Sequence, residues 1–166
     1  MIEFVLKNRK FRLHPDGIIY TRSINKYGQE SKSGCLWKEV KFFDNGNGYL
    51  KCTITIEGVQ KQISKHRLVW FAYNPEWNIF DGNQDNCIDH INRDKKDNRI
   101  ENLRNITNQQ NCFNTNAKGY WWSKSNSKYV AQIMVDGVIQ KLGTFDNEED
   151  AHNAYLEAKN TYHIIE

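Results

Sequence analysis

The stretch "CIDHINRDKKDNRIENLRNIT", Cys87 to Thr107, places an Asp-His pair after a short apolar step and at the head of a polar loop. Asp89 and His90 are neighbours on an expected strand, so their side chains project to opposite sides of the backbone. Asparagines follow at intervals, and the ones that bear on function are Asn98, Asn102 and Asn111. A carboxylate and an imidazole arranged in this way can act on one target from two directions.

These residue types suit the hydrolysis of a phosphodiester bond. That reaction needs a base to activate water and a cation to neutralise the leaving oxygen. Histidine titrates near neutrality and can be the base. Oxygen ligands from aspartate and asparagine favour Mg²⁺ or Mn²⁺ over zinc.

The length and composition predict a folded protein of one domain or a few small modules. The chain has 166 residues, of which 39% are hydrophobic and 13% aromatic. The first residues are too few and too charged for a signal peptide, and no apolar run approaches the roughly 20 residues that span a bilayer. We therefore expect a soluble, cytoplasmic protein without a membrane partner, located in the host cytoplasm or nucleoid if it is phage-encoded.

The four cysteines form no close pair of the kind that closed zinc sites use. They are Cys35, Cys52, Cys87 and Cys112. We expect reduced, mostly buried thiols, and no structural zinc.

The charge is mildly basic and unevenly distributed. The formal net charge is +3, and residues 1–50 carry nine Lys/Arg against five Asp/Glu. The cations that suit contacts to phosphates, which would position a duplex, are Lys7, Arg9, Lys10, Arg12, Arg22 and Lys26. A solvated basic face is almost as good an interpretation of the same residues.

The order of patterns predicts an α+β fold in three parts. Residues 1–64 alternate β-prone runs with turn signals, including a hairpin turn at Glu57-Gly58, and predict an N-terminal antiparallel β region. Residues 65–116 begin with a helix over 65–73, capped by Ser64 and stopped by Pro75, and continue through a strand, the polar loop, a second strand and a short helix. Residues 117–166 predict a three-stranded sheet and one amphipathic helix, with a capping box at Asp146 and Glu149.

The segment "DHINRDKKDNRIENLRNITNQQN" resembles the HNH motif of ββα-metal nucleases, in the H-N-N form of phage and intron homing endonucleases. The preceding "HRLVWFAYNPEW" is similar to the helix before the motif in that group. The resemblance implies that His90 is the general base and that Asp89 and Asn111 are the metal ligands. It implies that the Asn102 amide ties the loop together and helps to hold the histidine. Asn98 and Arg99 lie in the variable loop, where we expect only supporting roles, and His66 is expected to pack or to contact phosphate.

The C-terminal segment, residues 117–166 (the tail), resembles the APETALA-type DNA-binding domain of ethylene-response factors. The stretches that carry this resemblance are "GYWW", "KYVAQI" and "LGTFDNEEDAHNAY". That resemblance implies a sheet that lies in the major groove with a helix behind it. Alternation assigns Tyr120, Trp122, Tyr129, Ala131, Ile133, Leu142 and Phe145 to the helix side. The outward side would carry Trp121, Ser123, Gln132, Met134, Ile139 and Lys141. It lacks the arginines that read guanines, although Gln132 could read adenine and Met134 or Ile139 could touch a thymine methyl. The alternative is a sheet-helix module that binds protein or only stabilises the chain.

Two functions are compatible with this sequence. The first is a sequence-directed, metal-dependent endonuclease of homing type that cuts double-stranded DNA, as a nicking monomer or as a homodimer. The second is a DNA-binding repressor that has kept the fold and lost catalysis. The residues expected to contact DNA are Trp121, Ser123, Lys124, Lys128, Gln132, Met134 and Lys141 in the tail, with Arg99 and Arg104 in the nuclease segment.

Overall fold

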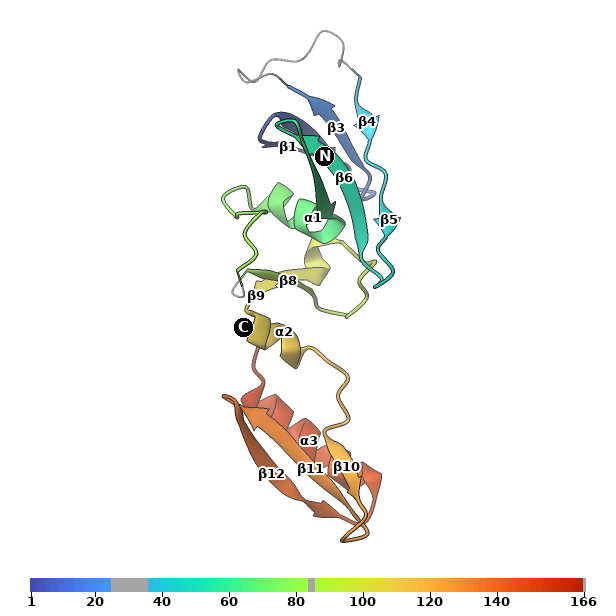
Figure 1. Cartoon of the computed structure of the whole chain (residues 1–166), viewed down its shortest axis with the longest axis vertical. Helices are drawn as coiled ribbons and strands as arrows, with labels where there is room; N and C mark the ends of the chain where they lie inside the picture. Colours follow the sequence, from blue (N-terminus) through green and yellow to red (C-terminus); the bar gives the residue numbers. More distant parts are fainter. Residues whose placement is uncertain (25–35, 84–85, 166) are drawn as a thin grey trace. The chain divides into compact units, whose positions relative to one another are not determined.

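The computed structural model describes residues 1–24, 36–83 and 86–165. It divides into two compact units, Met1–Asn105 and Ile106–Glu166, each of which is described by itself. Both units combine sheets with helices (Figure 1), so the α+β class expected from the sequence is confirmed. Within the described residues, no helix is long and apolar enough to cross a membrane.

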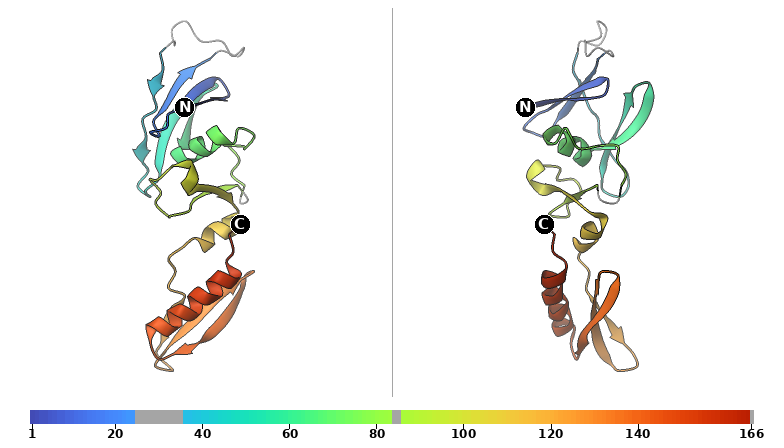
Figure 2. Two further views of the ribbon diagram at one scale, coloured as in Figure 1. Left: turned by 180° about the vertical axis from the view of Figure 1, so that it is seen from behind. Right: turned by 90° about the vertical axis from the view of Figure 1, so that its left-hand side faces the viewer.

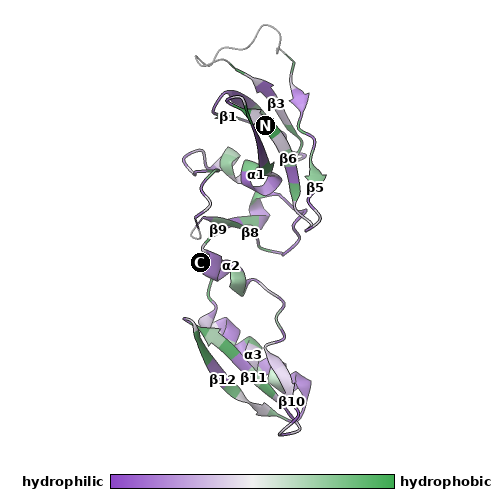
Figure 3. Cartoon of the chain, viewed as in Figure 1, coloured by the Kyte–Doolittle hydropathy of each residue, from purple (hydrophilic) through white to green (hydrophobic). Residues whose placement is uncertain are grey.

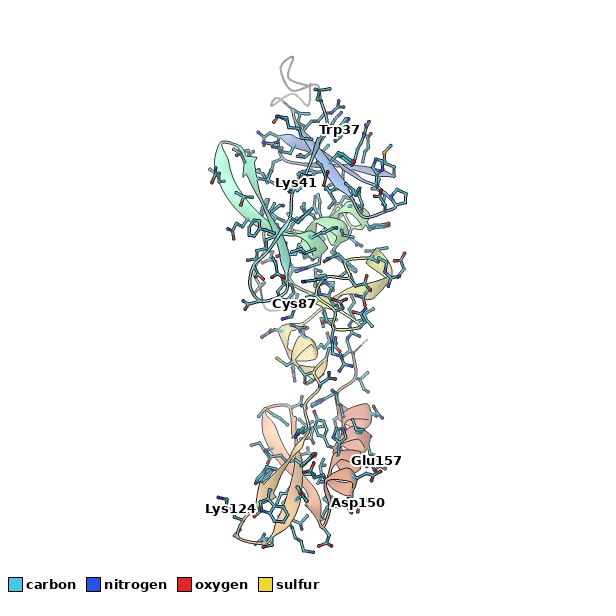
Figure 4. All side chains as sticks on the ribbon, turned by 90° about the vertical axis from the view of Figure 1, so that its right-hand side faces the viewer. Trp37, Lys41, Cys87, Lys124, Asp150 and Glu157 are labelled. Atoms are coloured by element: carbon cyan, nitrogen blue, oxygen red, sulfur yellow. The ribbon has the colours of Figure 1, made fainter. Side chains whose placement is uncertain are left out.

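The first unit opens with a four-stranded antiparallel sheet in the order β1-β2-β3-β4. Its strands are β1 (Ile2–Leu6), β2 (Arg9–Leu13), β3 (Ile19–Ser23) and β4 (Lys38–Glu39). Alternate residues point inward, so Phe4 and Phe11, which are cross-strand partners, stack with ring centroids 5.1 Å apart. Arg12 and Arg22 lie over the ring of Trp37, at 4.1 and 4.4 Å from its centroid, and Figure 4 labels this tryptophan.

A second antiparallel sheet follows, built from β5 (Phe43–Asp44), β6 (Leu50–Ile56) and β7 (Val59–Ser64). The turn between β6 and β7 is Glu57-Gly58, and both residues have positive φ, as a tight hairpin turn requires. Cys52, Ile54 and Ile56 are buried while the residues between them face outward. Figure 3 shows this alternation of hydrophobic and hydrophilic residues along β6.

Helix α1 (Lys65–Tyr73) has the bounds that the sequence predicts. Ser64 is at the N-cap position, although its side chain makes no capping hydrogen bond. At the other end the N–H of Asn74 donates to the carbonyls of Trp70 and Phe71, and Pro75 prevents another turn. The helix buries Leu68, Val69, Phe71 and Ala72, and contacts strands of both sheets.

After α1 the chain continues with β8 (Cys87–His90), the single turn η1 (Ile100–Asn102) and β9 (Leu103–Ile106), and β8 pairs with β9. Ile88 and Leu103 on these strands belong to the same hydrophobic core as Phe4, Ile54 and Phe71. The core therefore joins both upstream sheets, α1 and the β8–β9 pair. It crosses the boundary between residues 64 and 65 at which the sequence patterns change.

The second unit contains α2 (Asn108–Phe113), three antiparallel strands and the long helix α3 (Glu148–Tyr162). The strands β10 (Tyr120–Ser123), β11 (Lys128–Val135) and β12 (Val138–Phe145) form one sheet in sequence order. Helix α3 lies along one face of this sheet, as the two views of Figure 2 show. The predicted strand-strand-strand-helix order is confirmed, but α3 is capped by Asn147, which accepts from the N–H of Asp150, rather than by Asp146.

The predicted alternation of the sheet has two exceptions, Trp122 and Val130, and Val130 is 5% exposed although it neighbours the buried Ala131 on β11. Ala131 and Ile133 are 0% and 2% exposed beneath α3. Trp122 belongs to the same face, but it is 47% exposed and packs on the ring of Tyr129 at 4.7 Å rather than beneath the helix. The expectation that Trp122 is a core residue is therefore wrong, because Trp122 lies near the end of β10, which is only four residues long.

Gly119 sits where no other residue fits. Its φ is +74°, and a Cβ added to it would fall within the ring of Tyr155 on α3. This close approach lets the tyrosine ring lie directly against the backbone that leads into β10.

Candidate active site

Asp89 is held by an arginine on the neighbouring strand. Arg104 on β9 donates from Nε at 3.0 Å and from Nη2 at 2.8 Å, and both bonds reach the same carboxylate oxygen, Oδ2. The side chains of Asp89 and Arg104 are 9% and 25% exposed. A buried carboxylate needs such a partner, since burying an uncompensated charge costs several kcal/mol.

His90 is fixed by Asn98 from the loop. Nε2 of His90 lies 3.2 Å from Oδ1 of Asn98, and Nδ2 of Asn98 donates to the carbonyl of Lys96 at 2.9 Å. The second bond sets the amide orientation, because a carbonyl can only accept. Oδ1 must then accept from Nε2–H of His90, so the lone pair of the neutral form of this imidazole is on Nδ1. Asn98, expected only to support the loop, contacts the predicted base directly.

The side chain of Asn102 holds the loop between β8 and η1 together through hydrogen bonds. Its Oδ1 accepts from the N–H of Asn92 at 2.9 Å, and its Nδ2 donates to Oδ1 of Asn92 at 2.9 Å and to the carbonyl of Asp97 at 2.8 Å. Its side chain is therefore used fully within the loop, and Asn102 itself is buried. The sequence resemblance implies that this amide ties the loop together and helps to hold the histidine, and its side-chain hydrogen bonds go to Asn92 and Asp97 of the loop.

Two aromatic rings from upstream elements surround His90. The ring of His66, on α1, lies 5.1 Å from that of His90 in a T-shaped arrangement, and the ring of Tyr49 lies 6.0 Å from His90 and 5.4 Å from His66. Sequence reasoning missed Tyr49, because it precedes β6, far from the motif. Burial, followed by the charge of Asp89, raises the pKa of Tyr49.

The hairpin that carries Tyr49 is bonded to the loop between β8 and η1. Lys95 donates to the carbonyl of Asn47 at 3.0 Å, and its ammonium lies 4.6 Å from the centroid of the Tyr49 ring. Lys96 forms an ion pair with Asp44 at 3.3 Å. The loop between β8 and η1 is therefore held from outside by the β5–β6 turn as well as from within by Asn102.

These residues lie in a segment with a recognisable relative. Residues 64–112 match the HNH endonuclease family model. An uncharacterized HNH endonuclease of Acanthamoeba polyphaga mimivirus is 32% identical over 106 residues, which are 64% of this chain and 27% of that protein. The chain thus spans about a quarter of the length of this relative. No solved structure matches the chain.

HNH nucleases generally bind DNA and use a divalent metal. In the HNH segment, the carboxylate of Asp89 offers hard oxygen atoms of the kind that Mg²⁺ accepts as ligands while keeping several waters. No group of three or more His, Cys, Asp or Glu side chains that could hold a metal occurs in the parts of the chain that the structure describes. Any ion here would therefore need amide or water ligands as well. Asn111, the predicted second ligand, lies on α2 in the second unit, and its role stays a prediction.

The two HNH-segment arginines expected to contact DNA have protein partners. Arg99 donates from Nε and Nη2 to Asp97 at 2.9 and 2.8 Å, which lowers the pKa of that carboxyl well below its usual range. Its side chain is nevertheless 77% exposed, so it remains accessible to a phosphate. Arg104 is committed to Asp89 and is much less accessible. Arg99 also lines a cavity of about 550 Å³ with Lys65 and Lys96.

The tail residues expected to contact DNA lie outside the match. On the outward face Trp121, Met134 and Ile139 are 45%, 55% and 58% exposed. Lys124 is in the turn between β10 and β11 (Figure 4), and Lys141 is exposed on β12. Gln132, opposite Lys141, is half-buried, and Lys128 pairs with Asp146 at 2.7 Å. Ser123, which is half-buried, has its Oγ 3.0 Å from that of Ser125.

Two of the N-terminal cations expected to contact phosphates, Arg9 and Arg12, have protein partners. Nε of Arg9 donates to the carbonyl of Thr55 at 2.9 Å, and Arg12 pairs with Glu3 at 2.7 Å, while Lys26 lies outside the described residues.

Among the cysteines, Cys52 is buried and its pKa is raised to about 12 by burial, but Cys112 is exposed and Cys87 half-buried. The expectation that the thiols are mostly buried is therefore wrong for two of the three described. Cys35 lies outside the described residues.

Proposed function

We propose that the chain is a divalent-metal-dependent DNA endonuclease of homing type. The observation that supports this most strongly is the buried Asp89-His90 pair, in which each side chain has its own fixed partner. Arg104 fixes the orientation of the Asp89 carboxylate, and Asn98 holds the His90 imidazole through a hydrogen bond. The match of residues 64–112 to HNH endonucleases agrees with the same assignment.

In this proposal His90 is the general base. Because Asn98 accepts from Nε2–H, the lone pair of Nδ1 takes the proton from the attacking water. The water attacks the phosphorus in line with the bond to the leaving 3′ oxygen. Asn102 keeps the loop closed so that the imidazole does not turn away.

Asp89 and Asn111 would hold one Mg²⁺ or Mn²⁺ ion in this reaction. When bound, the ion would neutralise the charge that develops on the leaving oxygen. Arg104 orients the Asp89 carboxylate through Oδ2, and neither of its two bonds uses Oδ1. The residue types fit a hard cation and not a closed zinc site.

The tail is proposed to find the target site. The outward face of β10–β12 offers exposed apolar side chains and the amide of Gln132, which suit thymine methyls and adenine rather than guanine. Gln132→Ala should cost about 1–3 kcal/mol of discrimination at one base pair if the amide reads a base. Equal affinity of this variant and the wild type for every base at every position of the site would remove Gln132 from the readout.

The test is cleavage of supercoiled plasmid that carries the target site, with Mg²⁺ or Mn²⁺ present. His90→Ala should lower the cleavage rate by roughly 100-fold or more while leaving affinity for DNA near normal. Open circles would indicate nicking and linear DNA a double-strand cut. Site-specific binding without any cleavage by the wild type would favour the second candidate, a DNA-binding protein without catalysis. Full cleavage by His90→Ala would remove this histidine from the mechanism.

A further inference from the structure

A buried histidine that the proposed reaction does not use lies against the predicted base. His66 is 8% exposed, and its Nδ1 is buried with no hydrogen-bond partner among the described residues. A buried imidazole nitrogen without a partner costs free energy, so a buried position usually favours an apolar ring instead. What the His66 ring does contact is the ring of His90, edge to face, at 5.1 Å.

His66 stands on a rigid support. It is the second residue of α1, and the residues that follow it, Leu68 and Val69, are 0% and 3% exposed in the core. The third ring, Tyr49, is fixed separately, since its N–H donates to Oδ1 of Asn45 at 3.1 Å and Lys95 covers its face. Two rings on independent supports therefore border the imidazole of His90.

The His66 ring is uncharged under ordinary conditions. Burial, followed by the neighbouring His90, Arg67 and Lys51, lowers the pKa of His66 to about 3. A neutral ring with no hydrogen bond at Nδ1 acts through its shape and its quadrupole rather than through a proton.

We propose that His66, together with Tyr49, is a positioning residue that fixes the orientation of the His90 ring. Asn98 holds Nε2 of His90, and a hydrogen bond at this nitrogen would not by itself remove the freedom of the ring to tilt about it. The edge-to-face contact with His66 and the contact with Tyr49 remove that freedom. The inference rests on the proposed role of His90 as base, but the orientation of its ring can be measured without cleavage.

The first experiment compares ring and non-ring variants of the full chain. His66→Ala and His66→Leu should lower kcat by about 10–100-fold and change KM by less than about threefold, because a base misplaced by about an ångström loses rate rather than binding. His66→Phe keeps a planar ring and removes the buried nitrogen, so it should recover kcat to within about threefold of wild type. Tyr49→Leu, which removes the ring, should likewise lower kcat, whereas Tyr49→Phe, which keeps the ring, should stay close to the wild type. His14→Ala, which removes a ring packed against Tyr20 at 5.3 Å and outside this cluster, is the matched control.

The second experiment follows the His90 ring by nuclear magnetic resonance in chain labelled with ¹³C-histidine, with the signal assigned through its loss in His90→Ala. The wild type and His66→Phe should give one narrow His90 signal, whereas His66→Leu should shift and broaden it. An unchanged His90 signal in a folded His66→Leu protein would overturn the proposal even if the wild type never cuts DNA. A His66→Phe variant as slow as His66→Leu, with an intact fold by circular dichroism, would also overturn it. Loss of cleavage in His90→Ala alone tests the proposed function separately.

Discussion

Arg104 donates both of its bonds to one oxygen of Asp89, Oδ2, across the β8–β9 pair. The sequence resemblance separates these two residues into a metal ligand and a DNA contact. In the folded chain they form an ion pair, in which the guanidinium of Arg104 balances the charge of the buried Asp89 carboxylate. The orientation of Asp89 therefore depends on a residue from the neighbouring strand.

Arg104→Met should destabilise the chain by about 2–4 kcal/mol, since it leaves the Asp89 carboxylate buried without its guanidinium. Asp89→Asn combined with Arg104→Met should cost less than the sum of the two single changes. Urea unfolding of the four proteins measures this coupling. Strict additivity would mean that the ion pair contributes nothing to folding.

Asn98→Leu should slow cleavage by about 10–100-fold, because His90 loses the acceptor that places its proton on Nε2. Asn98→Asp keeps an acceptor at this position and should remain closer to wild type. Single-turnover rates on plasmid DNA, with affinity measured by gel shift, provide the comparison. Equal rates for the leucine and aspartate variants would show that the tautomer is fixed by something other than Asn98.

The low pKa of His66 predicts a specific loss of stability in acid. Folding lowers this pKa from 6.5 to about 3, so the unfolded chain binds the proton first as pH falls. The stability difference is absent above pH 6.5 and grows as pH decreases towards about 3. Between pH 7 and pH 5 the wild type should lose about 2 kcal/mol more than His66→Phe. Parallel urea midpoints for the two proteins over this range would contradict the low pKa.

Gly119→Ala should destabilise the second unit by about 3 kcal/mol or more, through the collision with Tyr155 and the positive φ. Gly137 is the matched control, because its φ is +78° and a Cβ there would meet nothing within 4 Å. Gly137→Ala should cost only about 1 kcal/mol. Thermal unfolding of both full-length variants separates collision from backbone strain, and equal losses would rule out the collision.

Trp122→Ala should cost less than Ile133→Ala. Trp122 is 47% exposed, whereas Ile133 is 2% exposed and lies in the small core beneath α3. We expect about 1–2 kcal/mol for the tryptophan and about 2–4 kcal/mol for the isoleucine. Chemical unfolding followed by circular dichroism measures both, and the reverse order would mean that Trp122 is covered in solution.

Local signals in the sequence predicted much of this fold. Periodicity and Pro75 predicted the bounds of α1, and the Glu57-Gly58 turn predicted a hairpin, because neighbouring residues alone determine these features. Alternation assigned Trp122 to the correct face of its sheet. It could not predict how far α3 extends over that face, because coverage depends on the packing of a separate element.

The site was predicted only in part for the same reason. Asp89, His90 and Asn102 follow from one motif whose spacing is visible in the chain. Tyr49 could not be found in this way, because it reaches His90 only after two sheets and α1 have packed together. The Arg104–Asp89 bond likewise depends on the pairing of β8 with β9.

The hydrophobic core that joins the two upstream sheets to α1 and the β8–β9 pair has a consequence for protein engineering. Residues 64–112 carry the recognisable motif, yet their apolar side chains are covered by Phe4, Ile54 and other residues that precede it. A transplanted cassette limited to the motif would expose those side chains and would lack the Tyr49 ring. The smallest portable scaffold for this chemistry therefore has to start with β1 and include α2, which carries Asn111, so chimeras should be joined after α2 rather than before α1.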